Sequence, residues 1–315
     1  MKRITLATTF AAVLIFSNSP AVGSLYSENF EVDPTASWTV NDPGLSDILA
    51  NFHYDYSQIG VPSAPNGTGT RGLKMTANNS GGVFSGFSVS PNANFSGNYV
   101  VRFDLWQNYV GPLGAGGSGS TQLSMFGIGT AGNVPVWPGS DPKESVMFAV
   151  TLDGGSAVDY RAYSSEAPVS YPAGSSVYHA PGGAINASDD YYSGFGGESA
   201  PAAQLALFPG QTETTDSGEI SFAWRRVEIK VQDGLAHWSI DGLPIATVDL
   251  TTVALGGERI LFGHSDTNSS SSTDPNDTLL NVTLIDNISV FVPEPSGLAM
   301  CVLGLAGWLS SRRRR

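Results

Sequence analysis

The amino-acid sequence predicts an all-β protein built as a two-sheet antiparallel sandwich. Many short runs alternate apolar and polar residues, which is the period of a half-buried strand. Gly, Asn and Ser separate these runs, and helical periodicity is nearly absent. No internal repeat is visible, which disfavours solenoids and propellers.

Strand patterns occur in several separate segments between residue 72 and residue 248. In residues 101–106, apolar side chains occupy alternate positions. Residues 224–231, 235–240 and 244–248 are separated by Asp233-Gly234 and Asp241-Gly242, and such pairs favour tight hairpins. We therefore expect three consecutive antiparallel strands there. Further strands are expected over 72–76, 83–89, 122–128, 146–152 and 158–163. Only 46–50 and 200–207 are expected to form a helical turn or two.

Composition supports one large domain over residues 24–291. Hydrophobic residues make up 41% of the 315-residue chain, enough for a sizeable core. The formal net charge of -13 makes nucleic acid an unlikely partner class. The single cysteine, Cys301, excludes a disulfide framework and a thiolate zinc cluster.

Residues 1–23 have the order of a secretory signal peptide. Lys2 and Arg3 precede an apolar run over 4–16, and small residues follow at 21–23. The alternative is a membrane anchor, but the run is shorter than the roughly 18 residues that a spanning helix needs. We expect cleavage after Gly23 and export of the remaining chain.

Residues 292–315 combine a spacer, an apolar stretch and a basic end. The spacer contains Pro293, Glu294 and Pro295, and residues 297–309 are almost free of polar atoms. The chain ends in the basic cluster Arg312, Arg313, Arg314 and Arg315. A short apolar helix followed by arginines can enter a bilayer and keep its charges on the cytoplasmic side.

This C-terminal combination resembles the PEP-CTERM sorting signal of bacterial exported proteins. The resemblance implies that an exosortase, a membrane-embedded cysteine protease, cuts near Glu294. The protein would then be transiently anchored in the membrane and released or transferred to the cell surface. The alternative is an ordinary tail anchor, which explains the apolar helix and the arginines but not Pro293 and Pro295.

The hairpin segments also resemble a known domain family. A strand beginning at Trp224 leads to Trp238 and then to Asp241-Gly242, which is similar to the late strands of concanavalin A-like lectin/glucanase domains. The resemblance implies a jelly roll over residues 25–291. A first strand ending at 29–31 would then pair with a last strand over 284–290.

Recognisable catalytic patterns are missing from the sequence. No Glu-x-Asp-x-Glu strand is present to supply paired carboxylates, and the spacing of Glu213, Asp216 and Glu219 does not replace it. A Gly-x-Ser-x-Gly elbow and a His-Glu-x-x-His motif are also missing. We therefore expect a non-catalytic protein. A polysaccharide-degrading enzyme would need two facing carboxylates. Asp104, Asp159 and Glu228 are candidates that only the folding of the chain could bring together.

Calcium is the one cofactor that the sequence suggests. Residues 266–277, beginning with Asp266, offer many hard oxygen ligands in one segment, although the pattern is not an EF-hand. The resemblance to jelly-roll carbohydrate-binding modules implies a second site, with Asp286 and Glu31 between the last and first strands. The alternative is a solvated loop and an Asp286 that binds backbone amides.

Six tyrosines form the candidate ligand-binding set. Aromatic rings with a hydroxyl rim suit stacking on sugar rings, and a long irregular segment inside a domain is often functional. The alternative is that these tyrosines hold the segment against the sheet. The set is Tyr160, Tyr163, Tyr171, Tyr178, Tyr191 and Tyr192.

The sequence as a whole predicts an exported, cell-surface β-sandwich that binds or organises extracellular polysaccharide without catalysis. Two alternatives stay open. One is a structural matrix or adhesion protein without a specific ligand, and the other is a polysaccharide-degrading enzyme.

Overall fold

A computed structural model describes residues 23–114, 121–140, 144–153, 155–267 and 274–293. Residues 1–22 of the predicted signal peptide, residues 268–273 of the predicted calcium segment, and Glu294, Pro295 and Arg312 to Arg315 lie outside the described residues. Within the described ranges, no helix is long and apolar enough to cross a membrane. Ser24–Pro293 forms one compact unit.

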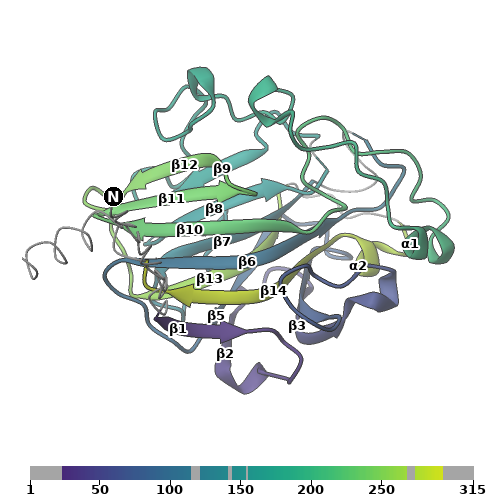
Figure 1. Ribbon diagram of the computed structural model, residues 1–315, viewed down its shortest axis with the longest axis horizontal. Coiled ribbons are helices and arrows are strands. Elements are labelled where there is room, and N and C mark those ends of the chain that lie inside the picture. Colours follow the sequence, from purple (N-terminus) through teal and green to yellow (C-terminus); the bar gives the residue numbers. More distant parts are fainter. Residues whose placement is uncertain (1–22, 115–120, 141–143, 154, 268–273, 294–315) are drawn as a thin grey trace, which may run out of the picture. The chain divides into compact units, whose positions relative to one another are not determined.

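Two antiparallel sheets make up this unit (Figure 1). The first sheet contains, in spatial order, β12 (Leu243–Asp249), β11 (Leu235–Ile240), β10 (Arg225–Gln232), β6 (Tyr99–Asn108), β14 (Val282–Phe291), β4 (Arg71–Ala77) and β3 (Ile48–Asp55), and β1 (Ser24–Glu28) pairs with β14. The second sheet contains β2 (Trp38–Asn41), β5 (Ser85–Pro91), β13 (Arg259–Asp266), β7 (Gln122–Thr130), β8 (Val146–Thr151) and β9 (Tyr160–Tyr163). The predicted sandwich is confirmed.

Two finer predictions about strand pairing are also confirmed. β10, β11 and β12 form consecutive hairpins. The first and last strands lie side by side, with Tyr26 opposite Val290 and Glu28 opposite Ile288.

The helical elements are few and short. Among the described residues they are α1 (Ala202–Leu207), α2 (Asp277–Leu280) and four 3₁₀ turns, η1 (Thr35–Ser37), η2 (Tyr56–Ile59), η3 (Pro181–Gly183) and η4 (Asp190–Tyr192). The expected turn within 200–207 is confirmed as α1. The expected turn at 46–50 is wrong, because residues from Ile48 onward belong to β3, where pairing with β4 overrides the weak local preference.

The main core lies between the two sheets. Val227, Ile229 and Val231 of β10 point inward, while the residues between them are partly exposed. Phe103 of β6 packs edge-on against Phe126 and Phe262 of the second sheet, at 5.2 and 5.0 Å between ring centroids. This alternation leaves the intervening side chains of β6 and β10 on the outer face of the first sheet.

A second apolar cluster covers part of that outer face. Trp106 of β6 and Leu284 of β14 pack there with Tyr56 of η2 and Phe222. The next outward positions on the same strands, Asp104 and Asp286, are polar. The outer face therefore changes from a covered apolar region to a polar region between neighbouring outward positions, from Trp106 to Asp104 on β6 and from Leu284 to Asp286 on β14.

Candidate functional site

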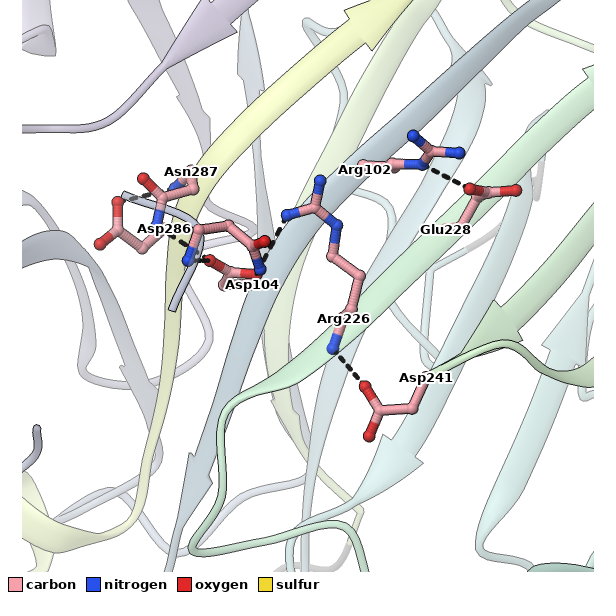
Figure 2. Close-up of polar contacts among 8 residues, drawn as sticks. Arg102, Asp104, Arg226, Glu228, Asp241, Asp286 and Asn287 are labelled. Atoms are coloured by element: carbon pink, nitrogen blue, oxygen red, sulfur yellow. Dashed lines mark hydrogen bonds and ion pairs between the residues drawn. The ribbon is translucent and has the colours of Figure 1, made fainter. Parts of the chain in front are cut away.

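Three ionisable side chains form a row across the middle of the first sheet. Arg226 of β10 pairs with Asp104 of β6, and Asp104 pairs with Asp286 of β14. Asp241, in the turn after β11, continues the row because its carboxylate accepts the Arg226 backbone N–H at 2.7 Å. Strand pairing thus brings together residues that are far apart in the sequence (Figure 2).

Asp104 is the centre of this row. Its side chain is only 1% exposed. Oδ1 accepts the Asn66 side-chain amide at 2.6 Å and the Arg226 guanidinium at 3.3 Å. Oδ2 accepts the Asn287 amide at 2.9 Å and the Asn66 backbone N–H at 3.3 Å. These hydrogen bonds offset the free energy that the Asp104 carboxylate loses when burial removes its water contacts.

The backbone of β14 is irregular where it supplies Asn287. Its pairing with β6 shifts register between Asp286 and Ser289, and Asn287 has a φ of 51°. Asn is among the residues that tolerate this left-handed conformation. The irregularity turns the Asn287 amide toward Asp104, as Figure 2 shows. Gly67 lies against the same side chain, so closely that a Cβ at position 67 would overlap the Asn287 amide.

An open pocket of about 430 Å³ lies over this arrangement. It is lined by β1 and the residue after it, the loop 66–68, the irregular part of β14, and Arg226. Most of its polar side chains are neutral hydroxyls or amides. The neutral polar side chains are those of Ser27, Asn29, Asn66, Thr68, Asn287 and Ser289.

Arg226 keeps hydrogen-bonding capacity toward this pocket. Its side chain is 34% exposed, and one of its guanidinium nitrogens contacts Asp104. Within the described part of the chain, its other guanidinium N–H groups have no hydrogen-bond partner. A guanidinium fixed at one nitrogen presents the remaining donors in a defined direction.

Asp286 lies behind the pocket and is 3% exposed. Its carboxylate accepts the Tyr56 hydroxyl at 3.0 Å and the Asn287 backbone N–H at 2.6 Å. Burial raises the pKa of Asp286 to about 7, and the nearby Asp104 and Glu31 carboxylates act in the same direction. Asp286 therefore changes protonation near neutral pH.

The predicted calcium ligands are placed as follows. Asp286 binds a hydroxyl and a backbone amide, the Glu31 carboxylate accepts the Arg71 backbone N–H at 3.1 Å, and buried Asp266 accepts the Asn78 amide at 2.5 Å. Among the described residues, no three acidic, histidine or cysteine side chains are grouped to hold a metal ion. The contacts of Asp286 match the alternative stated for it, in which it binds backbone amides.

Four of the six predicted ligand-binding tyrosines are buried. Tyr160, Tyr163, Tyr178 and Tyr192 are each exposed by 4% or less, so their rings are covered by protein and have no face open to a sugar. Tyr171 and Tyr191 are partly exposed.

The tyrosine hydroxyls hold the irregular segment in place. Tyr160 and Tyr192 stack at 4.0 Å with an interplanar angle of 11°. The Tyr191 hydroxyl donates to the Pro244 carbonyl at 2.6 Å, and the Tyr178 hydroxyl donates to the Tyr171 carbonyl at 2.9 Å. These contacts are the ones expected from the alternative interpretation, in which the tyrosines hold this segment against the sheet.

The three carboxylates proposed to meet in three dimensions are only partly brought together. Asp104 and Glu228 share the outer face of the first sheet, but each pairs with an arginine, and Glu228 binds Arg102 at 2.5 Å (Figure 2). Asp159 is buried and accepts the Thr151 hydroxyl and the Ala187 backbone N–H at 2.9 and 2.8 Å.

Asn66, Arg226 and Asn287 are pocket residues that sequence analysis did not identify. Two-residue periodicity in 101–106 and 224–231 was sufficient to place Asp104 and Arg226 on polar strand faces. Nothing in the sequence marks Asn66, because its role depends on a loop that folds over another strand.

No family model and no curated protein matches the chain. Solved structures resemble it at low identity. A Bacillus subtilis protein of unknown function with a galectin-like fold is 11% identical, with 85% of this chain and 96% of that chain covered and a TM-score of 0.46. The Emp47p carbohydrate recognition domain is 9% identical, with coverages of 81% and 88% and a TM-score of 0.40. A Bacillus licheniformis β-glucanase is 10% identical, with coverages of 87% and 100% and a TM-score of 0.38. Similarity at this level assigns neither a ligand nor a reaction to this chain.

Proposed function

We propose that this protein is a non-catalytic carbohydrate-binding β-sandwich and that the pocket above Asp104 is its glycan site. The observation that carries the proposal is a pocket lined mainly by neutral hydroxyls and amides, two of whose amides are held by one buried carboxylate. Sugars are dense in hydroxyl groups, each of which both donates and accepts a hydrogen bond. The pocket offers the complementary set of donors and acceptors.

Preorganisation of the pocket supports this proposal. Asp104 fixes the amides of Asn66 and Asn287, so their remaining polar atoms need little reordering when a ligand binds. An amide with one hydrogen bond to Asp104 keeps its carbonyl oxygen and its second N–H for a sugar hydroxyl.

The polar contacts of the nearby carboxylates support a role in binding rather than catalysis. Glycoside hydrolysis needs two carboxyl groups that flank the scissile bond. Asp104 is held by Asn66, Asn287 and Arg226, and Asp286 is 3% exposed. A polysaccharide-degrading enzyme is the second candidate, favoured by the pKa of about 7 at Asp286, which suits a general acid.

Glycan binding by the full-length chain tests the proposal. We expect selective binding on a glycan array, and Asn66→Ala or Asn287→Ala to weaken the affinity for the best ligand about tenfold, the value of one good hydrogen bond. Asn92→Ala is the matched control, because this exposed asparagine lies beyond β5 of the second sheet. Hydrolysis of a bound glycan would establish the enzyme, and absence of binding to all glycans would leave the structural matrix protein.

We also propose export through the signal peptide and sorting through the PEP-CTERM-like segment, on the sequence pattern at both ends. Cell fractionation with an antibody to the sandwich tests this placement. We expect surface or extracellular protein from the natural chain and membrane-retained protein after Glu294→Ala. Equal processing of both chains would contradict the role of Glu294.

A further inference from the structure

The charges around the pocket are predominantly negative. Glu28 lines the pocket and Asp104 lies beneath it. Behind it, Asp286 and Glu31 are close enough for their charges to interact. Arg71 is a second cation close by: its backbone N–H donates to the Glu31 carboxylate at 3.1 Å, and its guanidinium, which stays charged, donates to the His53 carbonyl at 3.0 Å. The pocket therefore has more carboxylates around it than cations.

Arg226 is the one cationic side chain among the residues described as lining the pocket. Its guanidinium already contacts Asp104 at 3.3 Å, and Asp241 accepts its backbone N–H. An anionic ligand group would have to share Arg226 with Asp104 and lie near Glu28. A binding site can reject a charged ligand by placing a group of the same charge next to the position that the ligand would occupy.

We infer that the pocket accepts uncharged sugars and rejects glycans that carry uronate or sulfate groups. This inference rests on the proposed glycan-binding function. A sugar hydroxyl suits both the acidic and the basic side chain of the pocket. It can donate a hydrogen bond to the Glu28 carboxylate or accept one from the Arg226 guanidinium. The net charge of -13 adds long-range repulsion of an acidic polymer.

A matched pair of polysaccharides tests the inference. The best neutral polymer from the array is compared with the same polymer after oxidation of its primary alcohols to uronates, using the full-length chain. We expect oxidation to weaken binding at least tenfold, and more strongly at low salt, because screening is weaker there.

The variant Glu28→Gln separates charge from shape. It keeps the size of the side chain and removes its charge, so we expect it to recover a large part of the binding to the oxidised polymer. Glu144→Gln is the control, since Glu144 lines a different, mainly apolar hollow with Trp137 and Leu45 and should recover none.

The outcomes distinguish this inference from the proposed function. Equal or tighter binding of the oxidised polymer, lost in Arg226→Ala, would overturn the inference and leave glycan binding intact. Failure of Glu28→Gln to recover binding would also overturn it. An unreactive array would overturn the proposed function itself.

Discussion

Arg226 and Asp104 are paired residues on adjacent strands, and their side chains meet at 3.3 Å on the outer face of the first sheet. The Asp104 side chain is almost fully covered, whereas the Arg226 side chain is one-third exposed. The pair therefore joins a buried anchor to a group that reaches the pocket. Asn66 and Asn287 bind the same carboxylate, so the stability of the sheet and the shape of the pocket depend on one side chain.

Replacing Asp104 by Asn should cost more stability than removing any exposed ion pair. The amide would face the Asn66 and Asn287 donors and leave Arg226 without its counter-charge. We expect a loss of about 2–3 kcal/mol in the free energy of unfolding, measured by urea denaturation. Glu228→Gln is the control. The Glu228 and Arg102 side chains are 27% and 41% exposed, so their ion pair should contribute about 0–1 kcal/mol. Equal losses in the two variants would contradict the anchoring role of Asp104.

Adding a single methyl group at Gly67 should disturb the pocket. The new Cβ would overlap the Asn287 side chain, so we expect weaker glycan binding and a loss of about 1–3 kcal/mol in stability. Gly194→Ala is the matched control, because a Cβ there meets no atom within 4 Å. Binding that survives Gly67→Ala unchanged would show that the orientation of Asn287 is not needed.

Stability should decrease as pH rises from about 4.5 to 8. Burial raises the pKa of Asp159 to about 6, of Asp286 to about 7 and of Glu219 to about 8. Each group contributes stability that is fully present below its unfolded pKa and is lost as pH rises through its folded pKa. His264 and His237 act in the opposite sense below about pH 6.5, because burial lowers the pKa of both, that of His264 to about 3, but the three carboxyl groups outweigh the two histidines. Thermal unfolding across this pH range measures the slope.

Glu219 should account for the upper part of this pH dependence. Its Oε2 accepts the Tyr109 hydroxyl at 3.1 Å, and its Oε1 is buried and has no hydrogen-bond partner among the residues that the structure describes. In Glu219→Gln we expect the slope between pH 7 and 8 to fall by up to about 1.4 kcal/mol per pH unit, the value for one proton. Glu213→Gln, at an exposed position, is the control. An unchanged slope would mean that Glu219 is ionised throughout this range.

The tyrosine segment should affect stability more than binding. Tyr192→Phe removes the hydroxyl that donates to the Ala184 carbonyl at 2.8 Å, so we expect a loss of about 1 kcal/mol with glycan affinity unchanged. Tyr171→Ala and Tyr191→Ala remove the two partly exposed rings. A tenfold loss of affinity in either alanine variant would support the hypothesis that these tyrosines stack on the sugar.

Local pattern predicted most of the sandwich. Alternation along β6 and β10, together with the Asp-Gly turns, identified strands whose inward faces carry the core. The strands β2, β3 and β13 were missed. β2 and β3 lie at sheet edges and are defined by their pairing with β5 and β4, whereas β13 is covered on both faces and therefore lacks apolar–polar alternation. The candidate pocket was missed for a related reason, since Asn66 and Asn287 lie 38 and 183 residues from Asp104.

The sequence by itself determined which residues face a core, where hairpins turn, and the two ends that predict export and sorting. These properties depend on periodicity and on near neighbours in the chain. The tertiary structure alone decided which polar side chains share a site and which tyrosines are covered. Register between strands and the folding of loops over them place those groups, and both depend on packing across long separations in sequence.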